Sequence, residues 1–277
     1  MIKTERRTRF QTLSISLALA IVATACGSDG VTFDDVAVGT PTIVGANHVD
    51  FVEISPFARF GPAQGDFTAG EHGTFGIFGA GQASPPHTHS GAYYAVVIEG
   101  GEMSNPFGTE ESPVTLPAGS FWSVPADAEH VTACLDADEE CRFFFHAAAG
   151  FDFFPLEEMT TARDAAAESI PVDSLSFEEL DPYDGAALVW GDQDAGPHGT
   201  IIRINAGDDT SELTHRNAFT AVPATGSLNI DDGSSVTELP TGSVIEFEAN
   251  TPHSLSCGSG SDCLVYLFSD QALEIRS

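Results

Sequence analysis

The sequence predicts an all-β protein made of two tandem β-domains, and three observations carry this prediction. Hydrophobic residues make up 42% of the 277 positions and 20 residues are Phe, which is too apolar for a disordered chain. The 27 Gly and 16 Pro suit many short strands joined by turns. The third observation is an internal sequence repeat that covers most of the chain, which indicates two copies of one domain.

The first 25 residues have the pattern of a bacterial lipoprotein signal peptide. Four basic residues precede an apolar stretch over 13–25, which is too short to span a bilayer comfortably, and a small-residue cleavage site follows. We expect residues 1–25 to be removed, Cys26 to carry a lipid, and residues 26–45 to form a tether to the membrane. An ordinary cleaved secretory signal is the alternative. Both readings imply export, either to the periplasm or outer membrane or as a secreted protein.

The internal repeat defines the domains. The segment Gly65 to Thr74 recurs 126 residues later as Gly191 to Thr200, and the offset becomes 123 after a shorter loop. We therefore expect a first domain over 46–154 and a second over 172–277. Further pairs in register are Phe51 with Phe177, Gly81 with Gly207, His89 with His215, Gly119 with Gly242, His130 with His253 and Cys134 with Cys257.

Short β-rich runs bounded by Gly, Pro and Asp account for most of each domain. In the first copy they are Thr74 to Phe78, Tyr93 to Ile98, Ser120 to Val124 and Arg142 to Phe145. Repeated strands at this spacing are typical of a sandwich or barrel. The linker over 155–171 differs, because Glu157 to Glu168 is rich in good helix formers and predicts a helix.

Three histidines in the first copy form a candidate metal site. His87 and His89 are two residues apart, so in a strand they share one face and can chelate a single ion. His130 follows in a second block of similar character. Three neutral imidazole nitrogens would leave the other coordination positions of an ion open for water, dioxygen or substrate.

The two blocks resemble the signature motifs of the cupin superfamily. The first is Gly81-x5-His87-x-His89 followed by Gly100, and the second is Gly119-x5-Pro125-x4-His130. The resemblance extends to uncharacterised two-domain bacterial cupin lipoproteins with His-x-His, Tyr-Tyr and Val-Thr-Ala-Cys. It implies a bicupin, with each copy a jelly-roll-like double-stranded β-helix barrel. It further implies that His87, His89 and His130 hold one divalent metal ion, with Fe, Mn, Zn and Ni all open.

The first copy departs from the cupin pattern at the fourth ligand. Where the family usually has Glu, this chain has Tyr93 and Tyr94, and no carboxylate follows on that strand until Glu99. Tyr93 has the parity of the two histidines and is the better candidate to face the site, where it would donate a hydrogen bond to a bound oxygen species or simply pack. Asp127 stands where the family has Gly, at a turn that needs a positive φ, which Asp tolerates.

The second copy lacks the complete histidine set. Leu213 replaces His87, and only His215 and His253 remain. Two imidazoles rarely hold a metal ion alone, so we expect the second copy to be structural. His72 and His198 occur in both copies, which favours a structural hydrogen-bonding role for them.

Other candidates for the first site are less specific. His146 either lines the pocket or is a buried structural histidine. The apolar lining would come from aromatic residues of the expected strands, although in a small barrel most of these are core. The candidates for the lining are Phe75, Phe78, Phe121 and Trp122.

The four Cys other than Cys26 form two local pairs, at 134 with 141 and at 257 with 263. In an exported protein such pairs are expected to be disulfides, each contributing roughly 2–3 kcal/mol. A Cys metal site is the alternative, but no C-x2-C spacing is present.

The charge of the chain excludes nucleic acid as a partner. The formal net charge is −31, and after removal of residues 1–25 the chain has no Lys at all. Phosphate contacts require Lys and Arg, so this acidity indicates solubility or a salty habitat instead.

Two functions remain open on the sequence. One is a metal-dependent, dioxygenase-like enzyme acting on a small organic substrate, with Tyr93 near the metal. The other is a non-catalytic cupin that binds a metal or small ligand at the cell envelope. A homodimer is compatible with either, because cupins often pair through strand exchange or face-to-face sheets.

Overall fold

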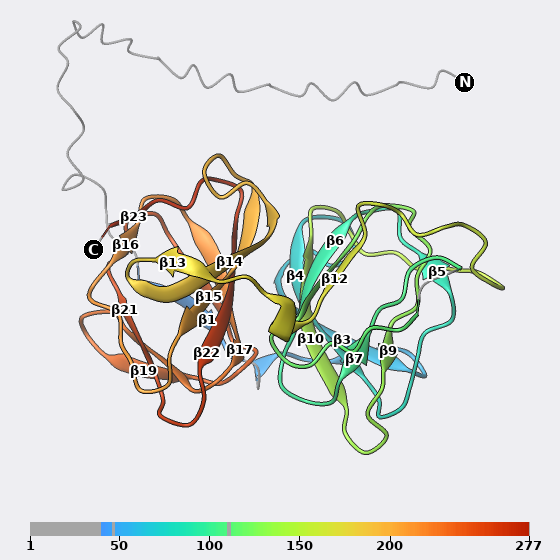
Figure 1. The fold of residues 1–277 in the computed structure, drawn as a ribbon, viewed down its shortest axis with the longest axis horizontal. Helices are drawn as coiled ribbons and strands as arrows, with labels where there is room; N and C mark the ends of the chain where they lie inside the picture. The colour runs from blue at the N-terminus through green and yellow to red at the C-terminus, as the bar shows by residue number, and fades with distance from the viewer. Residues whose placement is uncertain (1–39, 46–47, 110–111, 277) are drawn as a thin grey trace, which may run out of the picture. The chain divides into compact units, whose positions relative to one another are not determined.

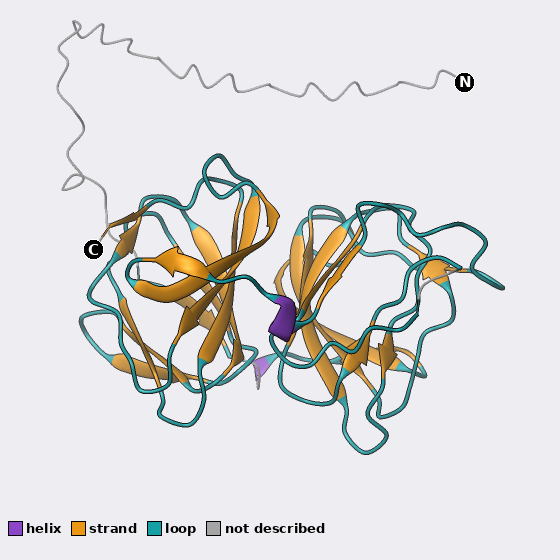
Figure 2. Ribbon diagram, in the orientation of Figure 1, coloured by secondary structure: helices purple, strands orange, loops and turns teal. Residues whose placement is uncertain are grey.

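The computed structural model describes residues 40–45, 48–109 and 112–276, and it confirms the all-β prediction. Strands dominate both halves of the described chain (Figure 2). The signal-peptide prediction and the lipidated Cys26 lie outside the described residues. In the described ranges, no helix is both long and apolar enough to span a membrane.

The first barrel is built around a seven-stranded antiparallel sheet and contains all four strands predicted in the first copy. The strand order is β12 (Glu168–Ile170), β8 (Phe121–Val124), β6 (Tyr93–Val97), β10 (Cys141–Ala147), β4 (His72–Phe78), β3 (Ala58–Gly65) and β2 (Val52–Ser55). Two short pairs complete the barrel: β5 (His87–Thr88) with β11 (Phe154–Pro155), and β7 (Met103–Ser104) with β9 (Ala133–Cys134).

The second barrel repeats the strand order of the main sheet, and one of its smaller sheets has an additional strand. Its main sheet has the order β1 (Thr42–Val44), β20 (Val244–Phe247), β17 (Phe219–Thr225), β22 (Cys263–Ser269), β15 (His198–Ile204), β14 (Tyr183–Gly191) and β13 (Glu178–Leu180). The smaller sheets are β16 (Thr214–His215) with β23 (Ile275–Arg276), and β18 (Leu228–Asp231) with β19 (Val236–Leu239) and β21 (Ser254–Cys257). A 3-10 helix, η3 (Val172–Ser174), precedes it.

Each barrel receives one edge strand from the segment that precedes the other barrel. β1 lies before the first barrel in sequence but pairs with β20 of the second, and in Figure 1 this blue strand lies among orange ones. β12 lies before the second barrel and pairs with β8 of the first. The exchange covers one edge of each sheet. Residues 42–44, which were predicted to belong to the tether, therefore form a strand, whereas residues 26–39 of the predicted tether lie outside the described residues.

The helix predicted over 157–168 is wrong. The chain there has turns and bends and no helix, and most of its side chains are exposed. Good helix formers in one short stretch do not suffice without an apolar face to pack, because most helical stability in proteins comes from packing. The segment is tied to the first barrel instead, where the Glu129 carboxylate accepts hydrogen bonds from the backbone N–H groups of Thr160 and Thr161.

Side chains alternate between the barrel interior and the contact between the two barrels. On β10, Phe143 and Phe145 lie in the first barrel's core, whereas Phe144 joins an apolar cluster shared with the second barrel. Phe75 and Phe121 belong to the shared cluster as well, so the prediction that they line a pocket is wrong. Strand parity would have assigned these faces once the register was known.

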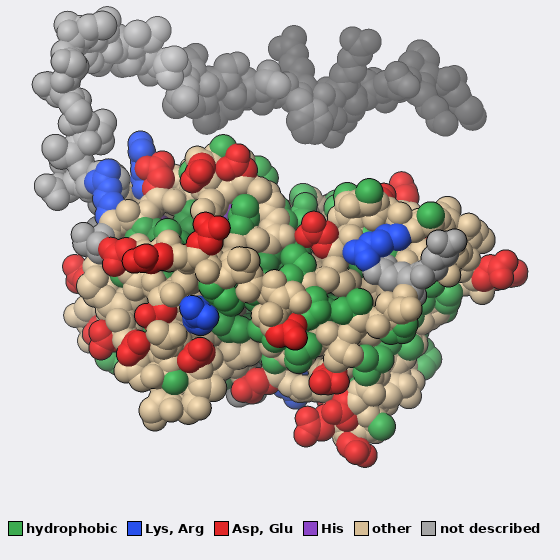
Figure 3. All heavy atoms as spheres, viewed as in Figure 1, with side chains coloured by type: hydrophobic (Ala, Val, Ile, Leu, Met, Phe, Trp, Pro, Cys, Tyr) green, Lys and Arg blue, Asp and Glu red, His purple; other side chains and the backbone are tan. Residues whose placement is uncertain are grey.

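Both predicted disulfides are formed, Cys134–Cys141 and Cys257–Cys263. The Asp127 backbone has φ 61° and its counterpart Asn250 has φ 60°, as expected for the turn at this position. Acidic side chains are scattered over the face drawn in Figure 3, where basic ones are few.

Candidate metal centre

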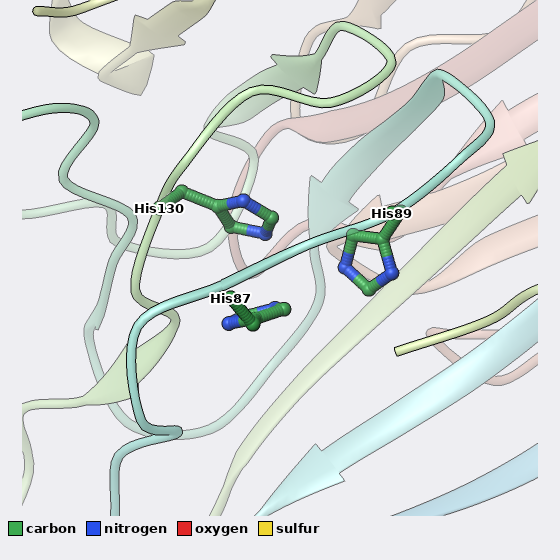
Figure 4. Close-up of side chains that lie close together, drawn as sticks. All are labelled: His87, His89 and His130. Atoms are coloured by element: carbon green, nitrogen blue, oxygen red, sulfur yellow. The ribbon is translucent and has the colours of Figure 1, made fainter. Parts of the chain in front are cut away.

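Three imidazole rings converge in the first barrel, and they come from two separate segments. His87 and His89 lie on and just after β5, and His130 reaches them from the segment after β8 (Figure 4). Their ligand nitrogens all lie within 4.8 Å of one another, and the side chains are 3%, 2% and 0% exposed. Reciprocal backbone hydrogen bonds of 3.0 Å between His87 and His130 hold the two segments together.

In each of the three rings, Nδ1 makes the hydrogen bond to a backbone carbonyl. His87 Nδ1 donates to the Pro85 carbonyl at 2.9 Å, and His130 Nδ1 donates to the Ala128 carbonyl at 3.0 Å. His89 Nδ1 donates to the carbonyl of Asp152. Because a carbonyl oxygen only accepts, Nδ1 carries the proton and Nε2 keeps its lone pair in each ring. Metal-binding histidines show this arrangement, with one nitrogen on a carbonyl and the other on the ion.

Burial keeps the three rings neutral. It lowers the pKa of His87 to about 3 and that of His89 to about 4, and it holds the pKa of His130 well below its usual 6.5. The neighbouring imidazoles lower the pKa of His87 and His130 further, because a second proton in the cluster would be repelled. Neutral imidazole is the form that binds a metal ion, so the site is ready for one at neutral pH.

One nitrogen of the cluster is buried without a partner, as are the Nε2 atoms of His72, His198 and His253, but among these four histidines only His89 belongs to a group of three converging ligands. His89 Nε2 is inaccessible to solvent and has no hydrogen-bond partner among the described residues. An unpaired buried polar atom is costly, and a cation placed among the three Nε2 atoms would satisfy it. Within the described ranges, this is the only group of three or more His, Cys, Asp or Glu side chains whose ligand atoms lie as close together as 4.8 Å.

The second copy has other contacts at the positions that correspond to the metal ligands. Its counterpart of His89, His215, has Nε2 hydrogen-bonded to the Tyr183 hydroxyl at 2.9 Å. The residue at the place of Tyr183 in the first copy is Phe57, which offers no hydroxyl. Leu213 stands at the position of His87 and is 1% exposed. That the second copy is structural stays a prediction.

The two tyrosines of the first copy point in opposite directions. Tyr93 lies in the barrel interior, with its hydroxyl 3.3 Å from His130 Nε2 and 3.4 Å from Trp122 Nε1, which donates to it. Tyr94 faces the second barrel and stacks on Trp190 at 4.1 Å between ring centroids. Of the two, Tyr93 is therefore the residue that lies beside the histidines.

The other candidate residues lie away from the cluster. His146 is directed to the second barrel, where its Nε2 lies 2.9 Å from the Tyr266 hydroxyl and its ring stacks on Phe268. His72 and His198 each place Nδ1 within hydrogen-bond distance of a Thr hydroxyl two residues on. Trp122 is part of the barrel core.

A segment that sequence reasoning missed covers the site. Phe151 and Phe153 lie against His89 and His87, each at 4.4 Å between ring centroids. Between them, the Asp152 carbonyl accepts from His89, and the Asp152 carboxylate accepts from the N–H and hydroxyl of Ser90. The repeat contained a signal. The disulfide loop is one residue shorter in the second copy, so the offset beyond it is 122, and Glu274 stands at the place of Asp152. Arg216 stands at the place of Ser90, and an ion pair of 2.9 Å joins it to Glu274.

Replacing Asp152 by Ala is expected to weaken metal binding about tenfold. The carbonyl that orients His89 remains, but the side-chain tie that fixes the segment to Ser90 is lost. Titration of the metal-free protein with Zn²⁺ would measure this change. Glu274→Ala breaks the corresponding tie in the second copy and should leave the affinity unchanged; equal losses in both variants would contradict the prediction.

A cavity of about 220 Å³ opens from the histidine cluster. His87, His89 and Tyr93 form one part of its wall, together with the hydroxyls of Ser84 and Thr132. Of the four residues expected to line it, Phe78 does so. The remaining lining residues are Ile54, Ser55, Phe57, Phe60, Phe143, Phe145, Phe151 and Phe153.

Similar folds occur among solved structures. An oxalate decarboxylase from Lactobacillus farciminis in complex with formate has a TM-score of 0.61 at 12% identity, covering 89% of this chain and 91% of that chain. A variant of the Bacillus subtilis oxalate decarboxylase has a TM-score of 0.61 at 10% identity, with coverages of 89% and 81%. The 7S globulin of Momordica charantia has a TM-score of 0.60 at 10% identity, with coverages of 84% and 86%. At these identities the likeness shows the fold alone.

Two tandem barrels of this topology have the fold of a bicupin, and a three-histidine group in the first barrel could hold a metal ion. The chain belongs to the family described as domain of unknown function DUF4437, whose model matches residues 58–276. None of the curated proteins matches the chain.

Proposed function

We propose that this bicupin is a metalloprotein that binds one divalent ion through His87, His89 and His130 and acts on a small organic molecule as a dioxygenase-like enzyme. The observation that carries the proposal is the convergence of three buried, neutral imidazoles whose Nδ1 atoms are fixed by carbonyl groups beside a largely apolar cavity. A bound redox-active ion would supply activation of dioxygen and polarisation of a substrate oxygen.

The residues of the chain bind, orient and exclude water. The three carbonyl partners hold the ring orientations, and the phenyl rings of the cavity keep water from the cluster. Burial raises the pKa of Tyr93 to about 12, so its hydroxyl keeps its proton and can donate a hydrogen bond to an oxygen atom of the substrate. With no carboxylate among the three ligands, the site retains the full charge of the ion and favours an anionic oxygen donor.

We further propose that the protein is exported and anchored to the membrane by a lipid on Cys26, with residues 1–25 removed as a signal peptide. The basic start, apolar stretch and small-residue cleavage site support this proposal. The two disulfides support export as well, because such bonds persist in oxidising compartments.

A non-catalytic binding role is the second candidate, and one feature of the cavity favours it. Among its described lining residues, the groups that could transfer protons are the histidines, which the ion would occupy, and Tyr93, which stays protonated. A protein loaded with a redox-inert ion would therefore bind a ligand without transforming it.

Oxygen uptake by the iron-loaded protein, tested with diketones, thiols, phenols and carboxylates, distinguishes the two functions. The enzyme proposal predicts uptake with at least one class, and Tyr93→Phe should keep the iron while lowering the rate roughly tenfold or more. Tyr94→Phe is the matched control and should not change the rate. Tight iron retention with uniform inactivity would favour the binding role, and failure to retain any metal would remove both.

A further inference from the structure

Half of the residues that line the cavity beside the histidines are phenylalanines. They number seven of fourteen, from β3, β4, β10 and the loops that flank the sheet. We infer that the ligand of this site is a molecule with one aromatic ring, or an apolar group of similar size, carrying an oxygen-donor head for the metal ion. This inference rests on the proposed function and specifies its substrate class.

The second copy shows that the barrel does not need these rings to fold. On β4, Gly76 pairs with Phe60 and Phe143, and Thr74 pairs with Phe145. On β15, the matching residue Ile202 pairs with Ala186 and Val265, and Thr200 pairs with Leu267. The repeat pairs Phe78 with Ile204, Phe151 with Leu273 and Phe153 with Ile275, and it pairs Phe57 with Tyr183. The phenyl lining is thus confined to the copy with the complete histidine set. Packing alone does not account for it, because the same topology is filled in the second copy mainly by aliphatic side chains.

The charge and size of the cavity limit the ligand. Among the described residues, no Lys, Arg, Asp or Glu lines it, so a charge that the ligand carried away from the ion would be buried without a partner. An apolar cavity of about 150 Å³ holds a benzene ring, and this one of about 220 Å³ has room for a ring with a short head group. A small dianion such as oxalate would leave the phenyl surface unfilled.

The polar atoms of the wall fix the direction in which the ligand lies. The Ser84 hydroxyl lies 3.3 Å from His87 Nδ1 and accepts the Thr132 N–H at 3.0 Å, so these groups gather at the histidine end. The Ser55 hydroxyl accepts the Ala58 N–H at 3.1 Å and is already engaged. The head group therefore lies at the ion and the ring among the phenylalanines. Ile54 and Phe153, which are 47% and 36% exposed, form the outer part of the lining.

Calorimetric titration of the zinc-loaded protein tests this inference without turnover. The probes are 1-phenylbutane-1,3-dione, its phenyl-free analogue pentane-2,4-dione, and oxalate, with the zinc content measured in every sample. We expect the phenyl compound to bind about 10- to 100-fold more tightly than the analogue, because a buried ring adds its transfer free energy. Oxalate should bind more weakly than the phenyl compound.

A pair of variants on β2 locates the binding site. Ile54→Asp places a charge at the outer lining and should reduce the affinity for the phenyl compound about tenfold. Val52→Asp, on the same strand at a residue that is 60% exposed and outside the lining, should not reduce it. Equal affinities for the two diketones, or tightest binding of oxalate, with zinc retained, would overturn this inference and leave the proposed function standing. Protein that retains no zinc would overturn both.

Discussion

Replacing His87 by Leu is expected to abolish metal binding while the protein keeps its fold. Leu is the residue that the second copy carries at this position, as Leu213, where the backbone hydrogen bonds with His253 match those between His87 and His130. The substitution removes one of three nitrogen donors, and we expect the metal affinity to fall by more than about 100-fold. The rise in unfolding free energy on adding metal, about 2.7 kcal/mol at a free ion concentration 100 times Kd, should then disappear.

Metal content after purification without a His-tag, together with thermal unfolding, measures both parts of this result. His215→Leu is the matched control in the second copy. It should keep the ion in the first barrel, although it loses stability because the buried Tyr183 hydroxyl is left without its partner. A His87→Leu protein that binds one ion with the affinity of the wild type would refute the three-histidine centre.

The sequence was most informative where a pattern was repeated or spaced. The offset of 126 residues, followed by 123, paired the two barrels correctly, and the His-x-His spacing with a third His after the second Gly and Pro block brought three rings together. The Cys pairs were readable because each closes a short local loop. In all these cases the determining residues are near neighbours in sequence or occupy matching places in the repeat.

The sequence was least informative where long-range packing decides the structure. Residues 157–168 have helical propensity, yet contacts with the first barrel and the absence of an apolar face leave them without a helix. The exchange of β1 and β12 between barrels is set by sheet edges that no local pattern records. The carbonyl of Asp152, which orients His89 from 63 residues away, could not be assigned as a partner before the fold was known.

The metal-free protein is expected to lose stability steeply as the pH falls from 6.5 towards 4. Burial lowers the pKa of eight histidines in the described chain, to about 4 for His72 and His89 and to about 3 for His87, His146 and His215. In the unfolded chain these groups titrate near 6.5, so between the two values the unfolded state binds more protons. Their contribution to stability is therefore complete above pH 6.5 and is lost as the pH falls.

The size of this effect is comparable with the stability of a typical domain. Consider a histidine with a pKa of 6.5 in the unfolded chain and of 4 or below in the folded protein. Lowering the pH from 6.5 to 4 then reduces the unfolding free energy by about 3 kcal/mol for this one group. Five such groups together amount to about 15 kcal/mol, the upper end of the roughly 5–15 kcal/mol by which folded proteins are stable, so we expect the midpoint of acid unfolding to lie above pH 4. Urea unfolding of the metal-free protein at pH 7.5, 6 and 5 would follow the loss.

His146→Phe isolates one histidine of this set away from the metal centre. Its ring stacks on Phe268 with centroids 3.9 Å apart, and Phe268 is itself the residue at the same place in the second copy, so a phenyl ring should pack here. The variant loses the hydrogen bond to the Tyr266 hydroxyl, which Trp190 Nε1 still reaches at 2.7 Å. Between pH 7.5 and pH 5, the variant should lose about 2 kcal/mol less unfolding free energy than the wild type, because one proton-linked group has been removed. A difference from the wild type that is the same at both pH values would show that His146 does not contribute to the acid sensitivity.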